Sequence, residues 1–210
     1  MRNSEGWIDM NRTIFSSAAI GILFVVAINL LAEEQAAAPI YQDGDFWHFS
    51  LGPRIYEAAI KDGKVKVFDA KPDQRIEVEA GIAQRLKVML AVEQDRKEFL
   101  QFPLSVGKVW NSSYQEDTPG PYRMPSISAR SSVTGIEEMT VAAGTFRVFK
   151  IERVETFPRR LARSNKAPPV TRTYTYYYSP QAKSVVKYRF ENRKRTTEID
   201  LIKFGSARPN

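Results

Sequence analysis

The sequence contains no cysteine. This absence excludes disulfide bonds, thiolate metal sites, cysteine nucleophiles and a lipid-modified N-terminal cysteine. Any attachment to a membrane must therefore come from the peptide itself. Stability must come from ordinary core packing, which suits a protein of the bacterial cell envelope better than one of the animal extracellular space.

Histidine is almost absent as well, because His48 is the single histidine of the 210 residues. Zinc sites built from His and Cys are therefore excluded. A Ser-His-Asp triad would depend on His48, yet no Gly-x-Ser-x-Gly motif accompanies it, and no phosphate-binding loop or Gly-x-Gly-x-x-Gly motif occurs. The sequence predicts no catalytic residue, cofactor or metal site. Strand alternation directs His48 away from Trp47 and Phe49, and so to the surface.

The chain has one long hydrophobic run, residues 14–32, which carries no charge and lies between Arg12 and Glu33. This order is typical of a signal sequence, and the run is also long enough to span a bilayer as a helix. We predict that residues 1–38 are a signal sequence or membrane anchor, with Met10 as the hypothetical start, and that residues 39–210 form a single β-rich domain. The expected location is periplasmic or secreted in a bacterium, or anchored at the inner membrane by residues 14–32.

Short blocks of alternating apolar and polar residues follow, and they predict half-buried strands. The clearest pair, residues 55–60 and 65–68, flanks an Asp62-Gly63 dipeptide that suits a tight hairpin turn. The other strands are predicted at residues 47–51, 75–80, 108–115, 126–141, 145–157, 170–178, 184–191 and 196–204.

Between these blocks the pattern changes. Apolar residues at helical spacing predict a short helix over residues 82–92, and residues 98–103 are expected to be extended. Residues 116–125 and 158–169 contain several prolines and predict exposed loops, and residues 142–144 predict the turn of a long hairpin. The expected fold class is all-β or mainly β: a curved antiparallel sheet, as a sandwich or partly closed barrel, with at most one or two short helices.

Three segments carry a resemblance to a known group: FPLSVGKVW at residues 102–110, VAAGTFRVFKIE at 141–152, and YYYSP at 176–180 leading to VVKY at 185–188. Together they resemble a family of uncharacterised exported bacterial β-proteins, a domain of unknown function. The resemblance implies a fold class and an exported location, and it carries over no activity and no catalytic residue. The residues themselves predict structural roles, with Trp110, Phe146 and Tyr178 as core or rim aromatics.

Positive charge is concentrated in one stretch. The whole chain carries a net charge of +7, yet residues 157–197 hold eleven Lys and Arg against the single acid Glu191. Such asymmetry favours an anionic neighbour such as an anionic lipid, lipopolysaccharide or a cell-wall polymer, although a solvated basic face without a partner is the alternative. The predicted contact residues are Arg159, Arg160, Arg163, Lys166 and Arg172.

Three functional classes remain open, in this order: a non-enzymatic envelope binding or accessory protein, a carrier of a lipid or other apolar ligand, and a carboxylate-dependent hydrolase. The candidate acids for the hydrolase are Asp43 with Asp45, and Glu137 with Glu138. A row of tyrosines at 174, 176 and 178 shares one strand face with Arg172 and could bind a ligand or pack beneath the sheet. Export argues against nucleic acid as the partner.

Overall fold

The computed structural model describes residues 34–71, 74–78, 81–91, 99–115, 126–158, 168–192 and 195–206. The chain divides into two units, Met1–Glu33 and Glu34–Asn210, and all described residues belong to the second. Residues 1–33 of the predicted signal or anchor segment therefore lie outside the described residues, whereas its last residues, 34–38, belong to the second unit and include a short strand, Gln35–Ala36. No helix in the described part is long and apolar enough to cross a membrane.

The described residues form twelve strands and one short helix, α2 (Ile82–Met89). The predicted fold class is confirmed, because the protein is mainly antiparallel β and its large sheet is not closed. The strands are β1 (Gln35–Ala36), β2 (Asp45–Leu51), β3 (Arg54–Lys61), β4 (Lys64–Lys71), β5 (Gln74–Glu77), β6 (Leu104–Ser105), β7 (Val109–Tyr114), β8 (Ile127–Val141), β9 (Gly144–Phe157), β10 (Val170–Ser179), β11 (Ser184–Asn192) and β12 (Arg195–Ser206).

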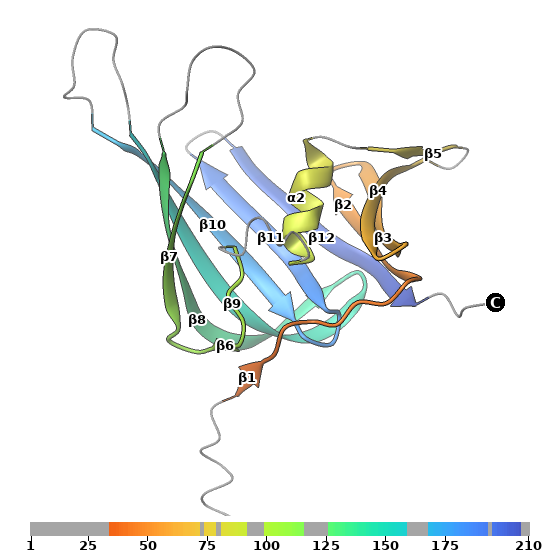
Figure 1. The fold of residues 1–210 in the computed structure, drawn as a ribbon, viewed down its shortest axis with the longest axis horizontal. Coiled ribbons are helices and arrows are strands. Elements are labelled where there is room, and N and C mark those ends of the chain that lie inside the picture. The colour runs from red at the N-terminus through yellow and green to blue at the C-terminus, as the bar shows by residue number, and fades with distance from the viewer. Residues whose placement is uncertain are drawn as a thin grey trace, which may run out of the picture. The chain divides into compact units, whose positions relative to one another are not determined.

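Ten strands make one curved sheet in the order β5-β4-β3-β2-β12-β11-β10-β9-β8-β7 (Figure 1). Two meanders, β2 to β5 and β7 to β12, are joined where β2 pairs antiparallel with β12. Because β5 and β7 lie at opposite edges, the chain between them must cross one face of the sheet. That connection contains α2 and the short strand β6, which pairs with β1.

The predicted turns are confirmed by their backbone angles. Asp62 and Gly63 have φ of 52° and 67°, which a two-residue hairpin loop requires. Ala142 and Ala143 form the turn between β8 and β9, and Gly144 follows with φ of 131°.

The predicted helix is confirmed, but it is shorter than residues 82–92. It ends at Met89, and Ala91 adopts a left-handed φ of 55° that does not continue a helix. The expected extended segment at 98–103 differs more, because its described part, residues 99–103, bends across the sheet and forms no strand. Phe99 and Phe102 pack edge-on against Tyr176 and Tyr178, at 5.1 and 5.2 Å between ring centroids.

We call the sheet face that α2 covers the inner face, and the opposite one the outer face (Figure 1). Trp47, Phe49, Leu86, Met89 and Ile151 belong to one buried cluster that joins both meanders to the helix, and each is at most 2% exposed. Burial of each large apolar side chain contributes about 1.5–3 kcal/mol, so this cluster is the main source of stability.

Polar contacts attach β2 and the segment before it to the loop between β10 and β11. Tyr41 donates a hydrogen bond to the carbonyl of Lys183 at 2.8 Å, and Trp47 Nε1 donates to the carbonyl of Ala182 at 2.7 Å. The buried carboxylate of Asp45 lies 3.1 Å from the Lys183 ammonium. These contacts hold β2 beside the end of the second meander.

Candidate functional site

Two charged residues are buried on the inner face of β9. Arg153 and Glu155 are 1% and 3% exposed, and Arg153 Nε donates to Glu155 Oε1 at 2.9 Å. The same oxygen accepts a hydrogen bond from the hydroxyl of Tyr114 at 2.7 Å, and an Arg153 terminal nitrogen lies 3.3 Å from Ser131 Oγ. Burial of a charge is costly unless it is paired and hydrogen-bonded, and these contacts satisfy that condition.

Aromatic rings enclose the Arg153 guanidinium. Its central carbon lies 4.5 Å from the ring centroid of Phe99 and 5.7 Å from that of Tyr114. The segment that crosses the inner face therefore covers the ion pair, because Phe99 belongs to that segment. Cation–π contacts of this kind are strongest where water is excluded.

Beside the ion pair, three aromatic rings of β10 and β11 stack on one another. Tyr174 lies 4.9 Å from Phe190 at an interplanar angle of 22°, and 6.2 Å from Tyr188 at 27°. Cross-strand pairing explains the stack, because Tyr174 is directly opposite Phe190 and Tyr188 is its diagonal neighbour. Tyr188 is buried, whereas Tyr174 and Phe190 are only partly buried.

Two exposed arginines approach this stack from different elements. Arg172 of β10 pairs across the sheet with Glu155, and its guanidinium lies 4.3 Å from the Phe157 ring. Arg85 projects from α2 to within 5.9 Å of the Tyr188 ring. We call Arg85, Arg172, Tyr174, Tyr188 and Phe190 the inner-face site.

The tyrosine hydroxyls of the inner-face site stay protonated at neutral pH. Burial raises the pKa of Tyr188 to about 12, with Arg85 and Arg172 opposing the shift and Glu155 adding to it. Burial and the charge of Glu155 also raise the pKa of Tyr174, although a hydrogen bond from Arg172 opposes this. The site therefore offers neutral hydroxyls and permanent guanidinium charges, which suit binding better than acid–base catalysis.

The predicted anion-contact residues are only partly within the described structure. Arg159, Arg160, Arg163 and Lys166 lie outside the described residues, so their contact with a partner remains a prediction. Arg172 is described, and it lies on the inner face with the tyrosine row. That row does share one face, with Tyr176 and Tyr178 buried in the core.

The candidate hydrolase acids do not face one another. Asp45 accepts hydrogen bonds from Ser206 and from the backbone of Gln42, whereas exposed Asp43 accepts one from the backbone of Gly63. Glu137 and Glu138 are adjacent in β8 and therefore point to opposite faces. In the described ranges, no group of three or more His, Asp or Glu side chains is arranged to hold a metal ion.

His48 lies on the outer face, as strand alternation predicts. Its Nε2 is 3.6 Å from Glu57, which also contacts Arg75. Burial lowers the pKa of His48, and the charges of Lys203 and Arg75 lower it further, while Glu57 opposes them. The imidazole is thus neutral over most of the physiological range and belongs to a surface polar cluster.

Sequence reasoning did not single out Arg153 and Glu155. The sequence did contain a signal: Arg153 and Glu155 follow Ile151 at every second position of β9, so all three share its inner face. Charged residues at strand positions that face the core indicate a buried ion pair or a binding site.

No protein-family model matches the sequence, and no curated protein matches it. Among solved structures, a candidate lipoprotein of Parabacteroides distasonis is similar at 12% identity and a TM-score of 0.48, covering 82% of this chain and 100% of its own. The hypothetical lipoprotein YmcC of Escherichia coli is similar at 12% identity and a TM-score of 0.40, covering 77% of this chain and 85% of its own.

A candidate exported protein with a YmcC-like fold from Bacteroides fragilis is similar at 11% identity and a TM-score of 0.40, covering 81% of this chain and 100% of its own. Likenesses this weak assign neither a family nor a function to the chain. The resemblance to the uncharacterised exported family therefore remains a prediction.

Proposed function

We propose that this protein is an exported, non-enzymatic binding protein of the bacterial envelope and that it binds an anionic component through the inner-face site. The contacts of two exposed arginines with a partly buried aromatic stack support this proposal most directly: Arg85 lies near the Tyr188 ring, and Arg172 donates a hydrogen bond to Tyr174. Guanidinium groups pair with phosphate or carboxylate, and the adjacent rings offer apolar surface. An anionic phospholipid is the first ligand to test.

The test compares sedimentation of the full-length chain with phosphatidylglycerol and with phosphatidylcholine vesicles. The difference in bound protein between the two vesicle types measures charge-dependent binding, because insertion of the uncharged N-terminal run would occur with both. Arg85→Gln and Arg172→Gln should each weaken this difference about fivefold, because a cation at an anionic surface contributes about 1 kcal/mol. Arg54→Gln is the matched control, since Arg54 is an exposed arginine of β3 in the other meander.

Added salt should weaken the binding of the parent protein, because exposed charges are screened within about 8 Å at physiological ionic strength. Equal binding to both vesicle types, or equal losses for Arg172→Gln and Arg54→Gln, would overturn the proposal. The predicted loop contribution is tested by changing Arg159, Arg160, Arg163 and Lys166 to Gln together. Binding unchanged in that variant would confine the contact to the inner-face site.

A carrier of a lipid or apolar ligand is the second candidate, and the partly buried rings of Phe99, Tyr174 and Phe190 on the inner face favour it. Mass spectrometry of gently extracted protein should then find a co-purifying lipid, and Tyr174→Ala should reduce its amount. Export itself is tested by a reporter that is active only outside the cytoplasm, fused after Asn210. A silent export reporter beside an active cytoplasmic one would place the protein elsewhere.

A further inference from the structure

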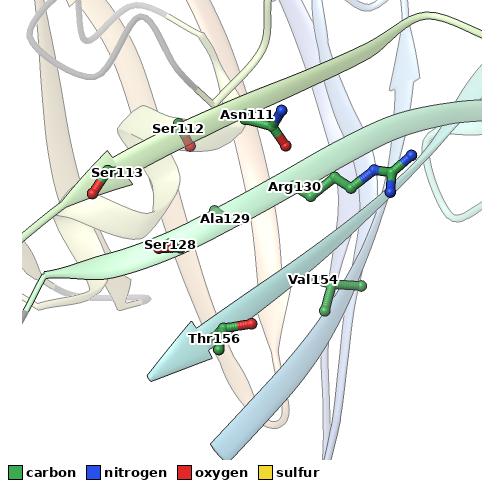
Figure 2. A pocket seen from close by; sticks show the side chains of 8 residues that line it. All are labelled: Asn111, Ser112, Ser113, Ser128, Ala129, Arg130, Val154 and Thr156. Carbon is green, nitrogen blue, oxygen red and sulfur yellow. The ribbon is translucent and has the colours of Figure 1, made fainter. Parts of the chain in front are cut away.

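The outer face carries an open hollow of about 800 Å³ at the end of the sheet formed by β7, β8 and β9. Figure 2 shows the side chains that line it on adjacent strands. Six of them belong to two cross-strand rows of the outer face: Asn111, Arg130 and Val154 in one, and Ser113, Ser128 and Thr156 in the other. We call these six residues the outer hollow.

The residue types that β7 contributes to the outer hollow are unusual for a strand. Asn is depleted in strands and Ser is not a strand former, yet β7 carries Asn111, Ser112 and Ser113 in succession. A strand that departs from its local preference without a gain in packing is expected at functional or strained sites. Asn111, Ser113, Ser128 and Arg130 are all exposed, so packing does not explain them.

The chemistry of the outer hollow restricts its ligand. Hydroxyl and amide groups supply hydrogen-bond donors and acceptors, Arg130 supplies one positive charge, and none of the described residues that line the hollow is an acid. The polar groups of the side chains leave no continuous apolar surface for a lipid tail, because Val154 and Ala129 are the apolar residues among the described lining. A nucleic acid would need several cations along its phosphates. Sugar rings present both hydroxyl groups and C–H surface, and an acidic sugar adds a carboxylate for the guanidinium.

The form of the hollow restricts the ligand further. Sites for small molecules are enclosed, whereas this hollow is open across three strands. The two rows run across the strands, and Thr173 and Thr171 continue them on β10 as exposed residues. An extended polymer lying across the strands fits such a surface.

We propose that the outer hollow is a second binding site, which takes an acidic polysaccharide chain with Arg130 on a sugar carboxylate and the hydroxyl rows on the sugar hydroxyls. It lies on the face of the sheet opposite Arg172 and Tyr174, so it is independent of the inner-face site. A protein with both sites would bind an anionic lipid and an acidic glycan by separate surfaces.

The test uses polygalacturonate as the acidic probe and dextran as the neutral one. The full-length chain is run through native gels that contain one polymer or the other, and its retardation is measured. Polygalacturonate should retard the parent protein, and dextran should retard it far less. Arg130→Gln should weaken the apparent affinity about tenfold, as the loss of one charge-assisted hydrogen bond does, and Thr156→Val about threefold, as the loss of one neutral hydrogen bond does. Arg54→Gln and Thr196→Val are the matched controls, because both parent residues are exposed strand positions outside the hollow.

The same variants are also tested with phosphatidylglycerol vesicles. Arg130→Gln should weaken vesicle binding less than Arg172→Gln does, and Arg172→Gln should weaken retardation by polygalacturonate less than Arg130→Gln does. If Arg130→Gln and Arg54→Gln are retarded equally, or if the two polymers retard the parent equally, the proposal for the outer hollow is overturned. Charge-dependent vesicle binding would still support the inner-face site in that case. If the parent protein does not bind phosphatidylglycerol vesicles, but polygalacturonate still retards it in a way that depends on Arg130, the inner-face site is overturned and the outer hollow is not.

Discussion

The buried ion pair of β9 allows a quantitative test, because an exposed pair with the same spacing lies in β11. Arg153 and Glu155 have side chains 1% and 4% exposed, whereas Arg189 and Glu191, also two residues apart and in contact, are 46% and 56% exposed. The chemistry of the two pairs is the same, and their exposure to water differs.

The expected magnitudes follow from this difference. Two unit charges about 4 Å apart attract by about 4 kcal/mol at an effective dielectric constant of 20. Arg153→Met leaves the Glu155 carboxylate buried without its cation, so it should destabilise the protein by about 3–5 kcal/mol. Arg189→Met should cost less than about 1 kcal/mol, because water solvates the remaining Glu191.

Urea unfolding followed by circular dichroism measures both changes. With a slope of about 2 kcal/mol per molar urea, Arg153→Met should lower the midpoint by about 2 M. Glu155→Gln should also be costly, and the double variant should lose less than the sum of the two single losses, because it leaves no unpaired charge. Strictly additive losses, or equal losses for Arg153→Met and Arg189→Met, would refute the reasoning.

Three further predictions concern the core, the backbone and an acid. Leu86→Ala should cost about 2–5 kcal/mol in urea unfolding because Leu86 is fully buried in α2, whereas Lys87→Ala should change stability by less than about 0.5 kcal/mol. Gly107→Ala should lower the melting temperature because Gly107 has φ of 84°, whereas Gly135→Ala, in open space without a positive φ, should leave it unchanged or raise it. Burial acts to raise the pKa of Asp45, but hydrogen bonds from Ser206, the Gln42 backbone and Lys183 outweigh it and lower the pKa. The stability from Asp45 is therefore present above about pH 4 and lost as pH falls through the lower folded-state pKa, so unfolding curves of Asp45→Asn should depend less on pH below 4.

Local sequence patterns determined most of the elements. Alternation and turn residues predicted the strands of the second meander to within one or two residues at most ends, because a half-buried antiparallel strand has a period of two. The Asp62-Gly63 turn, the short helix and the outward direction of His48 were readable for the same reason, since each depends on neighbours in the chain. The end of the helix was not readable, because the left-handed Ala91 carries no glycine signal.

Only the tertiary structure decided which strands meet and what lies on the inner face. The pairing of β2 with β12 joins residues about 150 positions apart, and no local signal encodes such a partner. The inner-face site likewise combines Arg85 of the helix with Arg172, Tyr174 and Phe190 of two strands. The sequence identified Arg172 and the tyrosine row, but their proposed function depends on the neighbours that α2 and β11 place beside them. The physical reason is that alternation sets which face a side chain takes, whereas its contacts are set by the path of the whole chain.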